Sequence, residues 1–600
     1  MAKIKSLPVR SKVKPADTWD LGSLFSSDAA WEKAFKTWTQ QIVAYEKFRG
    51  KLGDSPASLA ACLKFDSSFE RAGERLGTYA FLKSTEDTAS SPYQAMVGRF
   101  QNVASRAAQA ASYIRPEILA VSQAKMKRLL ASKPLRPYRL LLERMIRYKP
   151  HTLSKNEEKL LAMQSEMAAT ADKAFRQLTD ADLKFGTLKN EHNETVELTN
   201  ASFSALLHSP KRTVRRNAFH QFYDQYQAHE NTLAAVLSGS IQRDVYYARA
   251  RGYATARDAE LFSDHVPGTV YDNLIDAVHS QLPVLYRYLE LRRRKMRLRD
   301  IHHYDTYVPI LGELDKHHTW KQATRVILDA LEPLGTEYGR LLERGFSGRW
   351  CDRYPNQSKQ SGAFSCGTFD GDPYILMNYQ PQVLDHVFTL AHEAGHSMHS
   401  YFSARSQPFE YYDYTIFVAE VASTFNEQLL SKYLMRLAKT RQQRAYLVNR
   451  DIDAIRGTII RQTMFAEFEK IVHTLTEEGD PLTVERFKSV YRDLLQTYFG
   501  PDFVIDDPLA LECLRIPHFY RAFYVYKYAT GLSAAIALAQ RVTTGGKKEL
   551  SDYLSFLSGG CSKWPLDLLR DAGVDMESPL PVQTALAEFD RLVGELDELL

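Results

Sequence analysis

Two histidines and a glutamate lie in one short segment whose spacing suits a metal ion. His392 and His396 are four residues apart, and Glu393 follows the first histidine. On an α-helix this spacing places both imidazoles on one face, where they can share one tetrahedral ion. The carboxylate of Glu393 could then take a proton from a metal-bound water whose pKa the ion has lowered. The segment therefore predicts a site for one Zn2+ ion, with Glu393 as the general base.

A site of this kind needs a third protein ligand. A histidine six residues after the second would stand at position 402, but that residue is Phe402, which excludes the three-histidine pattern. Glu420 is the best candidate, because it is a lone acid among apolar and small residues, where acids are rarely buried unless they are paired or bind a metal. Glu427, seven residues further on, is open to two interpretations. It could orient a ligand imidazole, or it could be a solvated helix acid.

Other histidines and charges near this pattern have simpler interpretations. His386 and His399 are lone histidines on an expected helix, which more often pack or face solvent than bind a metal. The adjacent pair His302 and His303 is not expected to bind a metal either, because neighbouring side chains on one segment usually point apart. The basic run at residues 292–295 predicts a solvated helix face rather than a nucleic-acid site.

The elements that must position the metal segment can be predicted from periodicity. A helix should begin near residue 382, with Pro381 in its first turn. Its apolar stripe consists of Val383, Leu384, Val387, Leu390 and Ala391. Two short strands are expected just before it, at residues 363–368 and 374–378. The metal helix should therefore lie beside a small β element.

Helical patterns dominate the rest of the chain. Asp28 is a candidate N-cap and Gly50 a stop for one amphipathic helix, and Ser154 with Glu157 forms a capping box that should open a long helix. Further helical stretches are expected at residues 56–175, 211–250 and 268–298. The helical pattern is interrupted at residues 183–199, where a hairpin is predicted. We therefore expect a mostly α fold with an N-terminal helical lobe at 1–200 and a catalytic domain at 201–600.

The composition of the 600 residues is that of a globular protein, with 44% hydrophobic and 25% charged residues. The 77 basic and 72 acidic residues leave a net charge of +5, which is too small a bias to predict a nucleic-acid or membrane partner. The five cysteines are scattered, so no disulfide framework is expected. No run of about 18 apolar residues occurs. These features predict a soluble, cytoplasmic protein.

Several motifs together resemble one known family. They are Ser361-Gly362-Ala363, Asn378-Tyr379, Thr389-Leu390-Ala391-His392-Glu393, Glu420-Val421-Ala422-Ser423-Thr424, Ile516-Pro517-His518-Phe519-Tyr520 and Phe523-Tyr524-Val525-Tyr526-Lys527-Tyr528-Ala529-Thr530-Gly531. This set is similar to the oligoendopeptidase F group of the thimet oligopeptidase-like zinc metallopeptidases. The resemblance covers residues of about 205–585, and the N-terminal third agrees only in being helical and of fitting length.

The resemblance implies a two-lobed helical zincin fold, of the gluzincin type, with a deep central cleft. It assigns His392, His396 and Glu420 as zinc ligands and Glu393 as the general base. It also implies that the substrates are oligopeptides, laid as an extended chain along the edge of the small β element by main-chain hydrogen bonds, which is a sequence-tolerant mode of binding. Gly362 and Gly367 would permit close backbone approach there, or mark a plain turn.

The C-terminal signature implies hydrogen-bond donors for the tetrahedral intermediate. The matching residues are His518 and one or more of Tyr520, Tyr524 and Tyr526, of which Tyr526 is favoured. At least two of the four tyrosines between 520 and 528 are expected to pack in the core instead.

The function predicted from these features is zinc-dependent hydrolysis of internal peptide bonds in oligopeptides. A related exopeptidase, such as a carboxypeptidase or a dipeptidyl carboxypeptidase, is the nearest alternative. A helical scaffold that binds peptides without cutting them is a more distant alternative. Such a scaffold would not need the pair of histidine ligands, the general base and the downstream acid together.

Overall fold

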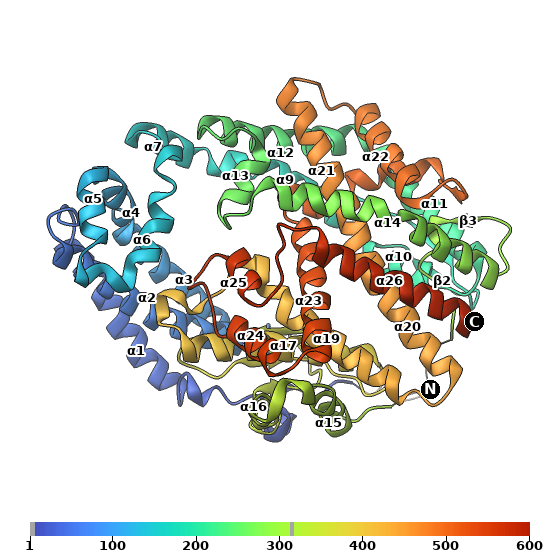
Figure 1. Cartoon of the computed structure of the whole chain (residues 1–600), viewed down its shortest axis with the longest axis horizontal. Coiled ribbons are helices and arrows are strands. Elements are labelled where there is room, and N and C mark those ends of the chain that lie inside the picture. The colour runs from blue at the N-terminus through green and yellow to red at the C-terminus, as the bar shows by residue number, and fades with distance from the viewer. Residues whose placement is uncertain (1–5, 313–316) are drawn as a thin grey trace. The chain divides into compact units, whose positions relative to one another are not determined.

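The computed structural model describes residues 6–312 and 317–600, and most of them are helical (Figure 1). None of the helices in this described part is long and apolar enough to cross a membrane. The chain divides into two compact units. The first comprises residues 1–150, 315–433 and 538–574, and the second comprises residues 151–314, 434–537 and 575–600.

The first unit contains twelve α-helices and a small sheet among the described residues. The helices are α1 (Asp28–Gln41), α2 (Pro56–Glu86), α3 (Ser91–Ala111), α4 (Ile114–Ala120), α5 (Gln123–Leu130), α6 (Arg139–Ile146), α15 (Trp320–Ala330), α16 (Gly335–Ser347), α17 (Asp385–Ser406), α18 (Phe409–Tyr412), α24 (Lys547–Leu557) and α25 (Pro565–Asp571). The strands are β4 (Cys351–Asp352), β5 (Phe364–Cys366) and β6 (Tyr374–Leu376). Helix α19 (Ile416–Leu437) begins in this unit.

The second unit is also built from helices with short strands. The helices are α7 (Lys155–Met163), α8 (Ser165–Ala168), α9 (Thr170–Arg176), α10 (Asn200–Leu207), α11 (Arg212–Ala228), α12 (Glu230–Ala250), α13 (Ala256–Phe262), α14 (Gly268–Lys295), α20 (Arg441–Ile455), α21 (Arg461–Glu478), α22 (Val484–Phe499) and α26 (Leu580–Leu599). The strands are β1 (Thr187–Lys189), β2 (Thr195–Glu197), β3 (Ile301–His302) and β7 (Phe503–Val504). Helix α23 (Tyr526–Thr544) begins in this unit.

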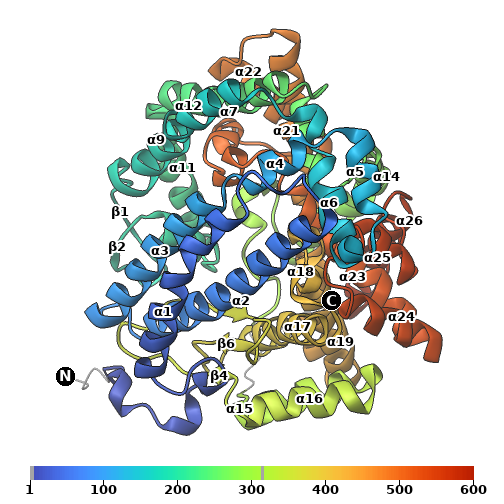
Figure 2. The same cartoon turned by 90° about the vertical axis from the view of Figure 1, so that its left-hand side faces the viewer.

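Helices α1, α2 and α3 of the first unit lie side by side (Figure 2). Aromatic side chains fill the space between them. The buried Trp38 ring of α1 stacks on Phe69 at 4.9 Å and on Phe100 at 5.5 Å between ring centroids. A Cβ atom at Gly73 would lie 2.9 Å from the Trp38 ring, so α2 can approach α1 this closely only because that residue is glycine. Large stacked rings thus give this helical layer a rigid core.

The small sheet of the first unit has the strand order β4-β6-β5. Strand β5 pairs with β6 in antiparallel fashion, with Ser365 opposite Ile375, and β4 pairs with β6 in parallel fashion. Residues 364, 366, 374 and 376 share one face, which packs against the core of the N-terminal helices. The other face packs against α17. The two predicted strands beside the metal helix are confirmed, and β4 is a third that the sequence pattern did not reveal.

Several boundaries differ from the sequence-based expectations. Helix α1 begins at Asp28, but its N-cap is Ser27, whose hydroxyl accepts the Ala30 N–H. The capping box at Ser154 is present, yet it opens the short helix α7 rather than a long one. The metal helix begins at residue 385, so Pro381 lies before its first turn. The hairpin is confirmed as the β1–β2 pair.

The basic run at the end of α14 is not simply a solvated face. Arg292 is buried and donates to the carbonyl oxygens of Asp305 at 2.9 Å and Val308 at 2.6 Å. The run therefore anchors the loop that follows the helix, and the expectation of a solvated face is wrong for Arg292. His303 is buried in the same region, where burial lowers its pKa to about 3.

The two compact units are each assembled from three separate stretches of the chain. The predicted boundary near residue 200 divides the chain into two consecutive segments, and it remains a prediction. The deep central cleft also remains a prediction. What is confirmed is the fold class, because helices dominate and the β element beside the metal helix is small.

Candidate metal centre

Helices α17 and α19 carry the predicted ligands and pass very close to each other. A Cβ atom at Gly395 would lie 2.5 Å from the carbonyl oxygen of Ala422 and 2.6 Å from the Cα of Ser423. No side chain larger than hydrogen fits at that position without a shift of backbone atoms. Gly395, which lies between the two histidines, therefore lets α19 approach the face of α17 that presents them.

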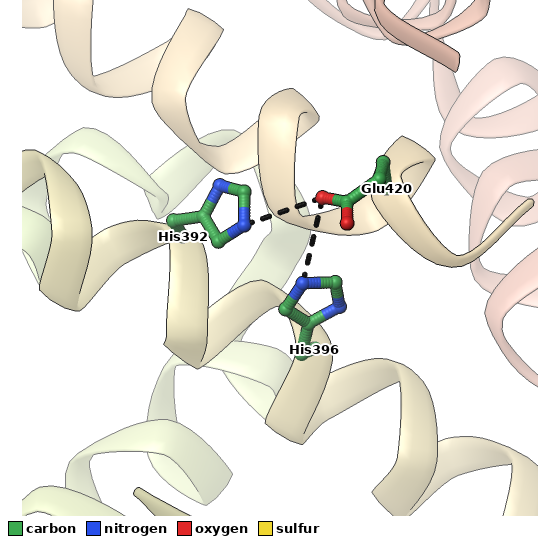
Figure 3. A group of neighbouring side chains, drawn as sticks. All are labelled: His392, His396 and Glu420. Carbon is green, nitrogen blue, oxygen red and sulfur yellow. Dashed lines mark ion pairs between the residues drawn. The ribbon is translucent and has the colours of Figure 1, made fainter. Parts of the chain in front are cut away.

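The two imidazoles and the carboxylate converge on one point (Figure 3). The Nε2 atoms of His392 and His396 lie 3.3 and 3.6 Å from Oε2 of Glu420. Zinc bonds of about 2.0–2.2 Å to nitrogen and oxygen in a tetrahedral site place neighbouring ligand atoms roughly 3.4 Å apart. The spacing of the three residues therefore fits a single zinc ion, and the predicted set is the one His/Glu cluster of this kind among the described residues.

Two further residues of α19 support the ligand pair. Oε1 of Glu427 lies 2.8 Å from Nδ1 of His392. If Nδ1 carries the proton, it donates to this carboxylate and leaves the Nε2 lone pair for a metal. Asn426 is fully buried and donates its side-chain amide to the carbonyl oxygen of Ala391 at 3.2 Å. Of the two interpretations of Glu427, the one that orients a ligand imidazole agrees with this geometry.

The electrostatics of the cluster favour a cation. Burial lowers the pKa of His392, but its hydrogen bonds to Glu420 and Glu427 outweigh that effect and raise it to about 10. His396 has its pKa lowered to about 4, first by burial and then by the charge on His392. The pKa of Glu420 is lowered even though burial alone would raise it, because His392 and His396 stabilise the carboxylate. One positive charge is thus held between these groups, and a metal ion could replace it.

Glu393 has the surroundings of a general base. Its side chain is buried on the α17 face toward the small sheet, and burial is the main reason that its pKa rises to about 7. The positive charge on His392 and a hydrogen bond from the Ser365 N–H act in the opposite direction. A carboxyl group that titrates near neutral pH can both accept and return a proton at that pH.

The edge strand β5 lies directly beside this carboxylate. The Ser365 hydroxyl is 2.8 Å from the hydroxyl of Ser397 on α17. A Cβ atom at Gly367 would lie 2.3 Å from the Cβ of Ser400 on the same helix. The glycine therefore lets the strand end pack closely against Ser400 of α17, and its predicted role in admitting a substrate backbone stays a prediction. Gly362 has a φ of +81°, as expected for a turn glycine.

The other histidines near the motif lie away from the metal cluster. His399 is buried, its ring stacks on Tyr414 at a centroid distance of 3.7 Å, and burial lowers its pKa to about 3. Nδ1 of His386 accepts the backbone N–H of Gln380 at 2.8 Å. Both therefore serve packing and loop anchoring, in agreement with the sequence-based interpretation.

The residues of the C-terminal signature lie in the second unit. Tyr526 is fully buried with its ring 5.1 Å from that of Tyr271. Tyr520 is buried against Phe175 at 4.4 Å. These two tyrosines match the expectation that at least two pack in the core. Their predicted role and that of His518 stay predictions.

A second group of rings in the same segment is accessible. His518 is exposed, and Tyr524 and Tyr528 are half-buried. Their ring centroids lie 5.3 to 6.2 Å apart. The turn before Tyr524 is unusual, because Phe523 has a φ of +50° without being glycine. Its N–H donates to the buried carboxyl of Glu469 at 3.0 Å, which holds this strained turn in place.

Sequence reasoning missed the residues that bring α17 and α19 together. Gly395 was read only as part of the motif, and Asn426 received no role. A small residue between two ligands on one helix face is a signal for close helix approach, although its partner helix cannot be named from the pattern.

Family models match most of the chain, and curated relatives match along its whole length. Residues 205–588 match peptidase family M3, and residues 117–185 match the family described as oligopeptidase F. The chain is 43% identical to oligopeptidase PepF of Bacillus subtilis over 600 residues, covering 100% of this chain and 89% of the relative. It is 36% identical to group B oligopeptidase PepB of Streptococcus agalactiae, covering 98% of each.

Solved structures agree as well. A structure from Chlamydophila abortus superposes with a TM-score of 0.94 at 34% identity, over 99% of this chain and 100% of that one. Oligoendopeptidase-F from Enterococcus faecium gives a TM-score of 0.74 at 34% identity, over 95% and 99% of the two chains. The resemblance seen in the motifs is thereby confirmed over the whole chain. The chain belongs to peptidase family M3, within the oligoendopeptidase F group, and is a metallo-oligopeptidase.

Proposed function

We propose that this protein is a zinc endopeptidase that hydrolyses internal peptide bonds of oligopeptides. The observation that carries the proposal is the convergence of His392, His396 and Glu420 at zinc-ligand spacing, with the buried carboxylate of Glu393 next to His392 on the same helix. Nitrogen and carboxylate ligands in this number suit zinc among the biological metals. Family membership and the relatives' names as oligopeptidases and oligoendopeptidases support the substrate class.

The chemistry can be divided between the metal and the chain. Zinc, when bound, supplies Lewis acidity that polarises the scissile carbonyl and makes water more acidic. Glu393 accepts the proton of the attacking water and later returns it to the leaving amine, a double task for which a pKa near 7 is suited. The backbone of Ser365 lies beside this carboxylate and partly offsets the rise of its pKa, so β5 borders the base.

The edge of β5 provides the main-chain groups for an extended substrate. Ser365 is a non-terminal residue of this edge strand and lies beside the base, so a peptide paired with β5 would bring a peptide bond close to Glu393. We further propose that His518 and a tyrosine of segment 520–528 donate hydrogen bonds to the carbonyl oxygen in the transition state. In this conformation Tyr524 is better supported than Tyr526, because its ring is accessible and lies beside His518.

The proposal is tested with internally quenched oligopeptides whose two ends are blocked. Protein purified without chelator should contain about one equivalent of zinc and cut these peptides at internal bonds, as seen by mass spectrometry of the products. A chelator should abolish cleavage, and added zinc should restore it. If blocked peptides were spared while free peptides lost terminal residues or dipeptides, the exopeptidase alternative would replace the proposal.

The non-catalytic scaffold makes a different prediction for the same samples. Less than about half an equivalent of zinc, together with intact peptides after long incubation, would favour it. A cytoplasmic location remains a prediction from composition.

A further inference from the structure

The small sheet of the first unit separates two different environments for substrate side chains. Ser365 points from one face of β5 toward Ser397 on α17, the helix that carries the base and the two ligand histidines. Phe364 and Cys366 point from the opposite face toward the N-terminal helices. A strand added to the outer edge of β5 would follow the same alternation, since side chains alternate between faces with a period of two. Every second substrate side chain would therefore face away from α17.

Helix α2 forms the wall on that second side. The carbonyl oxygen of Thr85 accepts the N–H of Gln360 at 3.0 Å, and Oε2 of Glu74 accepts the N–H of Phe369 at 3.0 Å. Between these two anchors, the ring of Phe81 lies 5.4 Å from that of Phe364. Helix α2 therefore runs antiparallel to segment 360–369, and Phe81 lies beside the residue that precedes Ser365.

Phe81 is left exposed at this position. Its exposed fraction is 41%, although the neighbouring Phe364 ring is half-buried against Trp19 at a centroid distance of 6.4 Å. The exposed Phe81 ring lies beside an open strand edge, next to the residue that precedes Ser365, whose hydroxyl contacts α17. It therefore offers apolar surface to a peptide that pairs with that edge. Val43 is also exposed, at 76%, but it lies on the short 3-10 helix Ile42–Lys47.

We propose that Phe81 is a specificity-determining residue that selects substrates with a large apolar side chain opposite Phe364. Directly opposite residues of paired strands have Cβ atoms about 4.5–5.5 Å apart, so a substrate side chain at this place would contact both Phe364 and Phe81. Two aromatic rings favour phenylalanine, tyrosine, leucine or methionine over small or charged residues. The inference rests on the proposed function, because it requires a peptide that adds to β5 near Glu393.

The test uses pairs of end-blocked, internally quenched peptides. The two peptides of a pair differ only in having phenylalanine or alanine at one position, and each pair of the series varies a different position. Phe81→Ala should lower kcat/KM about 10-fold for the phenylalanine peptide at one position of the series and change the alanine peptide less than about 2-fold. Phe81→Leu should keep most of the selectivity. Val43→Ala, which shortens another exposed apolar side chain of the same unit, should change cleavage of neither peptide.

Binding to Glu393→Gln protein provides a readout that does not depend on turnover. Fluorescence anisotropy should show a preference of about 10-fold for the phenylalanine peptide, and adding Phe81→Ala should remove that preference. Unaltered selectivity in Phe81→Ala, or an equal loss for both peptides, would overturn the inference even if the wild-type enzyme cuts normally. If the wild type binds with this preference but cuts neither blocked peptide, the proposed endopeptidase function fails while the inference stands.

Discussion

Glu427 illustrates how one side chain decides what another can do. Its carboxylate lies 2.8 Å from Nδ1 of His392, while Nε2 of the same ring points to Glu420. A proton held on Nδ1 leaves Nε2 free as a ligand and fixes the ring plane. From sequence, Glu427 could equally have been a solvated helix acid, because spacing along one helix does not tell which residues of another helix it meets.

Removal of this carboxylate should weaken metal binding. Glu427→Ala is expected to lower zinc affinity about 10- to 100-fold, since the His392 ring loses its orienting acceptor. Competition against a chromophoric chelator measures the affinity. Glu343→Ala removes an exposed acid of α16 in the same unit and serves as the control. Equal affinities for wild type and Glu427→Ala would contradict the orienting role.

At the scale of elements, the site depends on the close contact of α17 with α19. The sequence predicted that His392 and His396 lie together, because residues four apart on one helix share a face. Glu420 was inferred from its apolar surroundings rather than from geometry. The contact that brings it to the histidines depends on Gly395, Ala422 and Ser423, and helix packing of this kind cannot be read from one sequence.

A methyl group at Gly395 should therefore separate the two helices. Gly395→Ala is expected to cost about 1–3 kcal/mol of unfolding free energy by overpacking and to reduce the zinc content of the purified protein. Gly339→Ala is the matched control, because a Cβ atom there meets nothing within 4 Å and the helix gains stability from alanine. Denaturant unfolding and metal analysis measure both effects. A Gly395→Ala protein with wild-type stability and one equivalent of zinc would refute the close-approach argument.

At the scale of the whole molecule, local sequence patterns predict individual elements but not how the chain is divided into compact units. The capping box at Ser154, the β1–β2 hairpin and most helices could be predicted from local residues. The two compact units could not, because each combines three stretches that are far apart in sequence. Arg292 shows the same limit. Only the tertiary fold reveals that this residue of the basic run is buried and donates hydrogen bonds to the carbonyl oxygens of Asp305 and Val308.

Metal removal should act on one unit more than on the other. All three proposed ligands lie in the first unit, so zinc at 100 times its Kd should stabilise that unit by about 2.7 kcal/mol. Hydrogen exchange after chelation should accelerate in α17 and α19 and stay unchanged in α14 and α26 of the second unit. Uniform acceleration in both units, or none in α17, would be inconsistent with a metal bound where we place it.

The central claim is that Glu393 is the general base of a zinc site formed by His392, His396 and Glu420. The most direct measurement compares zinc content and turnover of an end-blocked oligopeptide in wild type, Glu393→Gln and the exposed control Glu343→Gln. We predict that Glu393→Gln keeps about one equivalent of zinc while kcat falls by about 10²–10⁴-fold, and that the control matches the wild type. Turnover of Glu393→Gln within a few-fold of the wild-type value would contradict the assignment.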